Sequence, residues 1–387
     1  MTTTTFDPTV GPLLAPEHLP GGNDAPRVDD VHAAAYTIPT EHPEADGTFA
    51  WGSTTIVVVH VRAGGVEGTG WTYGSTAIVD VVNTELRGVV LDADPTAIPA
   101  VWEAMVASVR NNMRAGVCGY AISALDIALW DLKARLLQCP LSQLWGQARR
   151  EIPVYGSGGF TTFDTALLDE QLGLWVEQLG IPRVKIKIGE SWAGRTGRDI
   201  ARIHHARERI GPGAELFVDA NGAYTAKEAI RVSAEVAGAG VTWIEEPVSS
   251  EDLAGLRRVR DCVTADVAAG EYGYDASYFA RLCSAVDCIQ IDATRAGGYT
   301  AWHRIAALAA GHQLQVSAHC APHLHAHCGV STPNARHLEY FSDHARIEEM
   351  LFDGAVAPVR GQLRPRTEAS GHGMQLRSSA SEPYRVR

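Results

Sequence analysis

The sequence predicts an α/β fold in which an eight-stranded barrel follows a smaller α+β domain. From Ile152 onward, eight short apolar runs recur, and each is followed by a polar segment of helical character. The runs begin roughly 23 to 32 residues apart, which is the length that a strand, a helix and two loops require. Eight parallel units of this kind close into a barrel. Before Ile152 the pattern differs, because alternating apolar residues come first and a helical region follows.

The N-terminal part divides into an arm and a domain. Residues 1–26 are rich in Thr, Pro and Gly and lack the basic and apolar regions of a signal peptide, so we expect a flexible arm. Residues 27–148 are expected to form the α+β domain. Up to about Thr69 this part alternates as antiparallel strands do, most clearly in TTIVVVHVRAGG. From about Thr96 to Gly146 the apolar residues have helical spacing.

Residues 149–342 are expected to form the barrel, and residues 343–387 a C-terminal segment. In chain order, the expected strands are IPVYG, RVKIKIG, ELFVDAN, VTWIEEP, ADVAAGE, CIQIDAT, QLQVSAHC and HLEYF. Two of the helical segments between them carry Gly near their ends, where helices often stop. The C-terminal segment shows no further strand-and-helix unit, so we expect an irregular tail that packs back on the first domain.

Charge and cysteine content limit the classes of function. The chain has 387 residues and a formal net charge of −12, which makes nucleic acid and anionic membranes poor partners. No stretch approaches the ~20 apolar residues of a membrane span. The seven cysteines are scattered and form no C-x-x-C pair, which indicates a reduced, cytoplasmic protein. We also expect a homo-oligomer.

Charged or titratable side chains lie at or near the C-terminal ends of seven of the eight expected strands. In a parallel barrel these ends converge on one mouth, where active sites are built. Each such residue alone is compatible with a solvated loop, but the whole series is not. The residues are Lys185 and Lys187, Asp219 with Asn221, Glu245 and Glu246, Glu271, Asp292, His319 and Glu339.

Three carboxylates on adjacent strands predict a metal site. Asp219, Glu245 and Glu271 offer only oxygen ligands, which suit Mg²⁺, whereas zinc would be expected to recruit His or Cys. A small-molecule carboxylate is the expected substrate. Removing the proton beside its carboxyl group leaves an enediolate, which a divalent ion and a nearby ammonium stabilise.

Two groups are candidate acid/base catalysts. Lys187 and His319 lie on the second and seventh strands and approach the mouth from different sides. We expect the positive charge of Lys185 to lower the pKa of Lys187 towards the value that a general base needs. Asp292 is expected to hydrogen-bond His319 and to fix its tautomer. Glu339, if protonated, would donate a hydrogen bond to an enediolate oxygen.

These motifs resemble the enolase superfamily, and more narrowly its mandelate racemase subgroup. The resemblance covers about residues 30 to 360 and is carried by the VKIKIG lysines, VDAN, IEEP, AAGE, the Asp292–His319 pair, HLEYF and the helix SALDIALWDLKARLLQCPLSQLWG. It implies a (β/α)₇β TIM-like barrel under an N-terminal α+β capping domain, with the Mg²⁺ ligands and bases named above. The muconate-cycloisomerase branch has a lysine at the sixth strand, where this chain offers only Arg295, so that branch is disfavoured and the role of Arg295 stays open.

Substrate contacts are expected from the capping domain and from the mouth. The resemblance implies that a loop of the capping domain closes the pocket, and the candidate is TIPTEHPEADGTFAWG. Its polar and aromatic residues suit a polyhydroxylated ligand, and an ordinary surface loop is the equal alternative. The candidate substrate-binding residues are Tyr36, Trp51, Asn221 and His323. The run HCAPHLHAHC offers Cys320, His323, His325, His327 and Cys328, but their spacing fits no common structural zinc site.

The expected reaction is dehydration of a sugar acid, an aldonate or aldarate, to a 2-keto-3-deoxy acid. The first alternative is a racemase or epimerase of a 2-hydroxy acid, in which the two bases act on opposite faces of one carbon. A second alternative is a barrel that binds a ligand without turnover.

Overall fold

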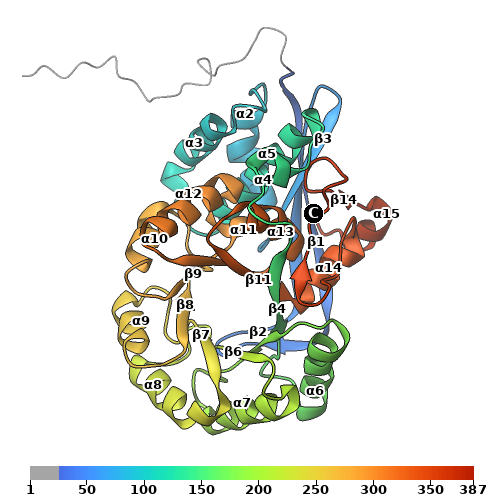
Figure 1. Ribbon diagram of the computed structural model, residues 1–387. Helices are drawn as coiled ribbons and strands as arrows, with labels where there is room; N and C mark the ends of the chain where they lie inside the picture. Colours follow the sequence, from blue (N-terminus) through green and yellow to red (C-terminus); the bar gives the residue numbers. More distant parts are fainter. Residues whose placement is uncertain (1–25) are drawn as a thin grey trace, which may run out of the picture.

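The computed structural model describes residues 26–387, so the predicted arm, residues 1–26, lies almost wholly outside the described part. A small sheet covered by helices sits beside a closed barrel, and the two are joined by the chain between α5 and β4 (Figure 1). Among residues 26–387, no helix has the length and apolar character that crossing a membrane requires.

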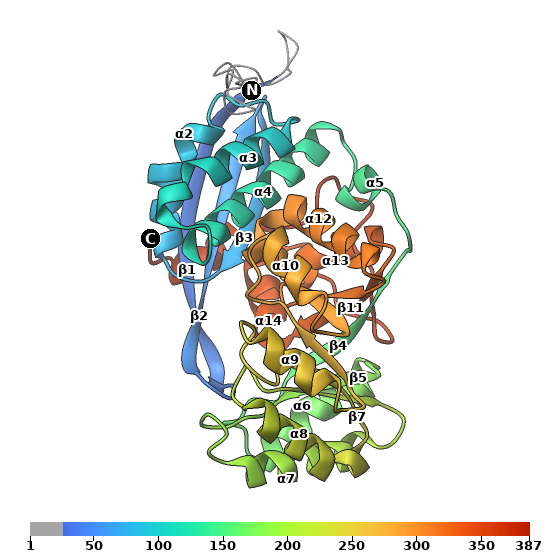
Figure 2. The ribbon, with the colours of Figure 1, turned by 90° about the vertical axis from the view of Figure 1, so that its left-hand side faces the viewer.

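The small sheet has three antiparallel strands in the order β1-β2-β3. They are β1 (Val28–Ala45), β2 (Ala50–Ala63) and β3 (Val66–Tyr73). The expected loop at residues 37–52 was wrong in extent, because β1 and β2 continue through most of it and only residues 46–49 turn. The extended β1–β2 hairpin therefore reaches away from the sheet to the barrel (Figure 2).

Helices pack on one face of this sheet at very short range. The long helix α4 (Val117–Leu136) lies against β3, where Gly68 and Gly70 leave room for its backbone. A Cβ atom on Gly68 would lie 2.3 Å from Ala128 O, so only glycine fits there. The other helices are α1 (Ala77–Val81), α2 (Arg87–Val90), α3 (Ile98–Ser108) and α5 (Leu141–Trp145), with a π-helical turn at Val82–Leu86.

The barrel has eight parallel strands, and the pairing of its last strand with its first closes it, which confirms the predicted fold class. The order of the strands around the barrel is the order of the sequence. They are β4 (Ile152–Gly158), β5 (Arg183–Lys187), β6 (Glu215–Asp219), β7 (Val241–Glu245), β8 (Asp266–Ala269), β9 (Cys288–Ile291), β10 (Gln315–Ala318) and β11 (Ala335–Phe341).

Helices surround the barrel strands (Figure 1). Several begin at a side-chain cap, as α8 does at Thr225, whose hydroxyl accepts from Glu228 N while Glu228 bonds back. The helices are α6 (Thr165–Gly173), α7 (Thr196–Ile210), α8 (Ala226–Glu235), α9 (Leu253–Arg260), α10 (Ala276–Leu282), α11 (Ala293–Ala296), α12 (Gly298–Gly311), α13 (Pro322–Ser331) and α14 (Ser342–Leu351), with a π-helical turn at Leu174–Gln178.

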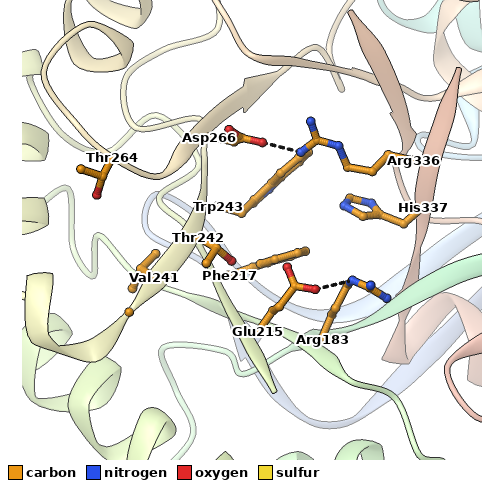
Figure 3. Close-up of a pocket in the computed structure, with 11 residues that line it drawn as sticks. Arg183, Glu215, Phe217, Val241, Thr242, Trp243, Thr264, Asp266, Arg336 and His337 are labelled. Atoms are coloured by element: carbon orange, nitrogen blue, oxygen red, sulfur yellow. Dashed lines mark hydrogen bonds and ion pairs between the residues drawn. The ribbon is translucent and has the colours of Figure 1, made fainter. Parts of the chain in front are cut away.

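The two ends of the barrel differ in chemistry. At the N-terminal ends of the strands a cavity of about 530 Å³ is lined by Phe217, Trp243 and His337 and flanked by the ion pairs Arg183–Glu215 and Arg336–Asp266 (Figure 3). None of the predicted site residues lines it. The predicted catalytic residues and metal ligands lie at the opposite end, the mouth, where the C-terminal ends of the strands meet.

The C-terminal segment returns to the capping domain. We expected this segment to be irregular, and at its beginning this was wrong, because the helix α14 directly follows β11. Beyond α14 come β12 (Phe352–Asp353), which pairs with β14 (Gln375–Leu376), β13 (Gln362–Leu363), which pairs with β4, and α15 (Ser378–Ser381). His372 N donates to Asp131 on α4 and Val386 N donates to Ala35 O on β1, so the segment is fastened to both layers of the cap.

Candidate active site

The structure brings eight of the predicted residues together at the mouth, and all of them are buried. Asp219 and Glu245 are the last residues of β6 and β7, and His319 directly follows β10. Successive residues of a strand face opposite sides, so Lys185 and Lys187 on β5 both point into the barrel. The remaining three are Glu271, Asp292 and Glu339.

Asp219, Glu245 and Glu271, called the carboxylate triad below, have the geometry of a metal site. Each offers one oxygen, and these oxygens lie within 4.8 Å of one another. Burial raises the pKa of Glu245 to about 8, although the Lys185 ammonium opposes the shift. Three buried carboxylates at this spacing repel one another unless positive charge lies between them. Their chemistry therefore fits a divalent cation that prefers oxygen ligands.

Unpartnered oxygens around the triad support the same conclusion. Among residues 26–387, the buried atoms Glu271 Oε2, Glu246 Oε1 and Asn221 Oδ1 have no hydrogen-bond partner. Buried acceptors without partners are rare in folded proteins, because each costs a lost hydrogen bond to water. These oxygens are therefore available to a cation or to the donors of a ligand.

The two lysines are held by the triad, which corrects one expectation. Lys185 Nζ lies 2.8 Å from Glu339 Oε1 and also contacts Glu245, while Lys187 Nζ contacts Asp219. Burial lowers the pKa of Lys187, but the Asp219 carboxylate outweighs burial, so the pKa stays above its usual value. Lys185 lowers the pKa of Lys187 as expected, but the expected net lowering was wrong, because the acidic neighbours outweigh the second ammonium.

His319 and Asp292 form the expected hydrogen-bonded pair, with Nδ1 and Oδ2 2.8 Å apart. The other oxygen of Asp292 accepts from Thr294 N and Thr294 Oγ1, both at 2.7 Å, so the carboxylate cannot rotate away. Burial lowers the pKa of His319, but the Glu271 carboxylate and the bond to Asp292 leave it above its usual value. The second ring nitrogen, Nε2, is 3.3 Å from Glu271 Oε2 and faces the triad.

Glu339 does not meet the condition for donating a hydrogen bond, because its positive neighbours favour the ionised form. Burial raises its pKa, but Lys185 and His319 outweigh burial and hold the pKa well below its usual range. Its oxygens accept from Ser157 Oγ at 2.5 Å and from Cys320 N at 2.9 Å. Glu339 therefore positions Lys185 and the Cys320 backbone.

The structure adds three residues that sequence reasoning missed or left open. Arg295 Nη1 lies 3.3 Å from Glu271 Oε1 and its Nε lies 3.3 Å from Asp292 Oδ2, so it bridges two site carboxylates. Its position in the first turn after β9, three residues beyond Asp292, could have identified it from the sequence as a site residue. Ser157 lies near the end of β4, the strand that pairs with β11, and its hydroxyl donates to Glu339. Only its position next to His319 in the sequence indicated that Cys320 lies at the site.

The backbone is unusual where the strands end. Asn221, Glu246, Cys320 and Ala321 have φ between 36° and 50°, which non-glycine residues rarely adopt. Such conformations persist only where surrounding contacts enforce them, and they cluster at functional sites. Here they closely follow β6, β7 and β10, at the mouth of the barrel.

The tip of the β1–β2 hairpin covers one side of the mouth. A Cβ atom on Gly47 would lie 2.7 Å from both Ile188 O and Ala220 O, which follow β5 and β6. Trp51 packs on Phe160, with ring centroids 5.6 Å apart, and its Nε1 donates to Glu44 at 2.8 Å. The hairpin thus places polar and aromatic side chains beside β5, the strand that carries Lys185 and Lys187.

Two predicted substrate contacts are corrected. Tyr36 is buried within β1, opposite Ile56 of β2, because it belongs to the core of the capping sheet and not to its tip. His323 is occupied at both ring nitrogens, by Glu348 Oε2 at 2.5 Å and by the backbone of Val356 at 3.0 Å. It therefore fastens α13 to α14 and does not line the mouth.

His325 and His327 bond to backbone groups, so these two histidines form no zinc site with His323. His325 Nε2 accepts from Ala293 N at 2.9 Å, and His327 Nδ1 accepts from Ser142 N at 3.3 Å. Burial lowers the pKa of His327 to about 3, so this ring is neutral.

Two family models match the chain. Residues 33–146 match the N-terminal domain of mandelate racemase / muconate lactonizing enzyme, and residues 168–380 match the enolase C-terminal domain-like family.

Curated relatives span most of the chain. A 3,6-anhydro-alpha-L-galactonate cycloisomerase from Streptomyces coelicolor is 31% identical over 362 residues, which are 90% of this chain and 97% of the relative. An L-talarate/galactarate dehydratase from Salmonella typhimurium is 29% identical over 330 residues, which are 81% of each chain.

Solved structures show the same fold. A mandelate racemase/muconate lactonizing enzyme-like protein from Rubrobacter xylanophilus superimposes with a TM-score of 0.90 and 46% identity, covering 93% of this chain and 100% of that one. A racemase from Streptomyces coelicolor A3(2) with bound magnesium gives a TM-score of 0.87 and 29% identity, again over 93% and 100%.

Proposed function

The chain belongs to the mandelate racemase/muconate lactonizing enzyme family of the enolase superfamily, and from this premise we propose that it dehydrates a sugar acid with the help of Mg²⁺. The reaction removes the proton beside the substrate carboxylate and expels the hydroxyl group of the next carbon. The product is a 2-keto-3-deoxy acid.

The proposal is carried by the positions of Lys187 and His319 on two sides of the carboxylate triad. Lys187 contacts Asp219 at one end, and His319 Nε2 lies 3.3 Å from Glu271 Oε2 at the other. A carboxylate substrate held between these ends presents its α-carbon to a lysine on one side and an imidazole on the other. That arrangement supplies both a base and an acid to one reacting centre.

Asp219, Glu245 and Glu271 would hold the ion. When bound, Mg²⁺ supplies positive charge that offsets the triad carboxylates around Lys187 and stabilises negative charge on a substrate carboxylate. The Lys185 ammonium, which Glu339 holds at 2.8 Å, adds fixed positive charge where the substrate oxygens would lie.

In the proposed reaction Lys187 or His319 takes the α-proton, and His319 gives a proton to the departing hydroxyl group. Asp292 keeps the Nδ1 proton of His319 in place, so that proton transfer takes place at Nε2. The hairpin tip with Trp51, together with Asn221 Oδ1, is proposed to contact the substrate hydroxyl groups.

The sugar-acid class is supported by the relatives and by the covered mouth. Relatives include a galactarate dehydratase and an anhydrogalactonate cycloisomerase, whose names describe acid sugars. The polar and aromatic hairpin tip over β5 and β6 suits a ligand with several hydroxyl groups. The cytoplasmic location and the homo-oligomeric state stay predictions.

A turnover screen tests the proposal. Purified protein with Mg²⁺ is incubated in D₂O with aldonates, aldarates, their lactones and anhydro acids. Dehydration yields a 2-keto product. The alternative, a racemase or epimerase of a 2-hydroxy acid, yields no keto product but exchanges the α-hydrogen and inverts the centre. If no acid in the library reacts in either way, the proposed reaction class is wrong.

Two variants test the assigned bases. Lys187→Ala and His319→Asn should abolish turnover while the circular dichroism spectrum stays unchanged. Lys227→Ala and His312→Asn change exposed residues of the same types and serve as matched controls. Wild-type turnover in both site variants would contradict the roles, and tight binding without turnover in the wild type would favour a ligand-binding barrel.

A further inference from the structure

A cysteine that the proposed reaction does not use lies among three potential ligands at the mouth. Cys320 Sγ is 3.2 Å from His319 Nε2 and 3.4 Å from Glu339 Oε2, and these two atoms are 3.8 Å apart. All three side chains are buried. They form a second group of metal-ligand type beside the carboxylate triad, and we call it the thiol triad.

The spacing of the thiol triad is close to that of a tetrahedral zinc site. With a Zn–S bond near 2.3 Å and Zn–N and Zn–O bonds near 2.0 Å, sulfur lies about 3.5 Å from either other ligand, and nitrogen lies about 3.3 Å from oxygen. The observed 3.2, 3.4 and 3.8 Å differ from these values by about 0.5 Å or less. Small side-chain movements would therefore place all three atoms around one ion.

The backbone and the neighbouring residues hold the ligands in place. Cys320 and Ala321 both have left-handed φ values, 50° and 39°, which turn the thiol toward the mouth. Cys320 N donates to Glu339 Oε2 at 2.9 Å, and Lys185 occupies the other oxygen, Oε1. Asp292 fixes His319 through Nδ1, so Nε2 remains the coordinating nitrogen.

A buried oxygen of the carboxylate triad lies beside one of the three ligands. Glu271 Oε2 is buried, has no hydrogen-bond partner among residues 26–387, and lies 3.3 Å from His319 Nε2. That is the separation of an oxygen and a nitrogen on one zinc ion, about 3.3 Å. The two triads therefore adjoin each other at Glu271 and His319.

We propose that His319, Cys320 and Glu339 form a binding site for Zn²⁺ and other thiophilic divalent cations, distinct from the oxygen-only carboxylate triad, and that its occupation stops the reaction. The thiol releases its proton to solvent when the metal–sulfur bond forms, and no oxidation or reduction occurs. Inhibition rests on the proposed function, because the ion would occupy the nitrogen through which His319 transfers protons. Binding itself does not depend on the function.

Cobalt binding to the full-length protein tests the site without reference to turnover. Co²⁺ is added to protein saturated with Mg²⁺, and the sulfur-to-cobalt charge-transfer absorption is recorded. One equivalent should produce the band in the wild type, and Cys320→Ser should remove it. Cys328→Ser and Cys262→Ser, which change a buried and an exposed cysteine elsewhere, should retain it. If Cys320→Ser does not fold, Cys320→Ala replaces it.

Zinc inhibition gives the second readout. Zn²⁺ should inhibit Mg²⁺-loaded wild type, and Cys320→Ser should raise the half-inhibitory concentration by more than ~10-fold, since even outer partners of metal ligands contribute about 10–100-fold. Three outcomes would each refute the proposed site. They are the absence of the band in the wild type, a band that persists in Cys320→Ser, and equal zinc inhibition of both proteins. If no substrate is found, the cobalt titration still decides on the site, and the failure then concerns the proposed function alone.

Discussion

Replacing Asp292 by asparagine should stop product formation while the fold stays intact. Asp292 Oδ1 accepts from the Thr294 backbone at 2.7 Å, so the amide oxygen of the variant would take that place. The amide nitrogen would then face His319 Nδ1, which now lies 2.8 Å from a carboxylate oxygen. Because an amide nitrogen donates, His319 would carry its proton on Nε2 and could no longer accept one there.

The size of the effect follows from the lost charge. At 2.8 Å and an effective dielectric constant of about 20, a carboxylate stabilises an imidazolium by about 6 kcal/mol. At about 1.4 kcal/mol for each factor of ten, the full loss corresponds to ~10⁴-fold in kcat. The amide dipole retains part of the interaction, so we expect a fall of ~10³–10⁴-fold.

The assay combines product formation with solvent exchange. The 2-keto product is measured in D₂O, and deuterium at the α-carbon is followed by NMR. If Lys187 takes the α-proton, exchange persists in Asp292→Asn although product formation stops. Asp126→Asn is the matched control, because Asp126 is also a buried aspartate that accepts from a threonine, but it lies on α4. A kcat for Asp292→Asn within about tenfold of wild type would refute the reasoning.

Three further outcomes are expected. Glu348→Ala should lower the free energy of unfolding by about 3 kcal/mol, because it leaves the buried indole of Trp71 and the phenol of Tyr73 unpaired. Denaturant titration measures this change. An equal loss of stability in Glu349→Ala, which changes an exposed residue, would contradict the prediction. Burial raises the pKa of folded Asp126 to about 7, above its ordinary 3.8, so its contribution to stability is full below about pH 4 and is lost as the pH rises through 7. Asp126→Asn should remove that decline, and parallel stability curves for the two proteins between pH 4 and 8 would disprove it. Dialysis against EDTA should abolish turnover, and Mg²⁺ alone should restore it; activity that survives chelation would exclude the metal site.

The barrel was predictable because its signals are local and repeated. Each strand is a short apolar run, and seven of the eight carry a charged or titratable residue at or near the C-terminal end, as in ELFVDAN and VTWIEEP. Parallel strands bring these ends to one edge whatever the details of packing, so the approach of Asp219 to Glu245 follows from topology alone. The hydrogen bond between Asp292 and His319 follows in the same way from neighbouring strands.

Other features depend on contacts that no local pattern reports. The pKa of Lys187 is set by carboxylates from strands distant in sequence, and these reverse the effect expected from the adjacent Lys185. Tyr36 and His323 are polar aromatic residues of the kind that line pockets, yet β1 turns one into the capping core and α13 turns the other toward Glu348. Helix α14 was missed because it buries polar residues, among them Asp343, His344 and Glu348, which in the sequence resemble a solvated tail.

The return of the C-terminal segment to the capping sheet bears on how the protein folds. Trp71 of β3 stacks on Phe352 at 4.4 Å, and the hydrogen bonds of Ala35 and Asp131 to Val386 and His372 join residues hundreds of positions apart. The core of the N-terminal capping domain is therefore complete only after the C-terminal segment has been synthesised. Contacts of such long range slow folding, and a fragment that ends at residue 148 would expose the Trp71 side of its sheet to solvent and to aggregation.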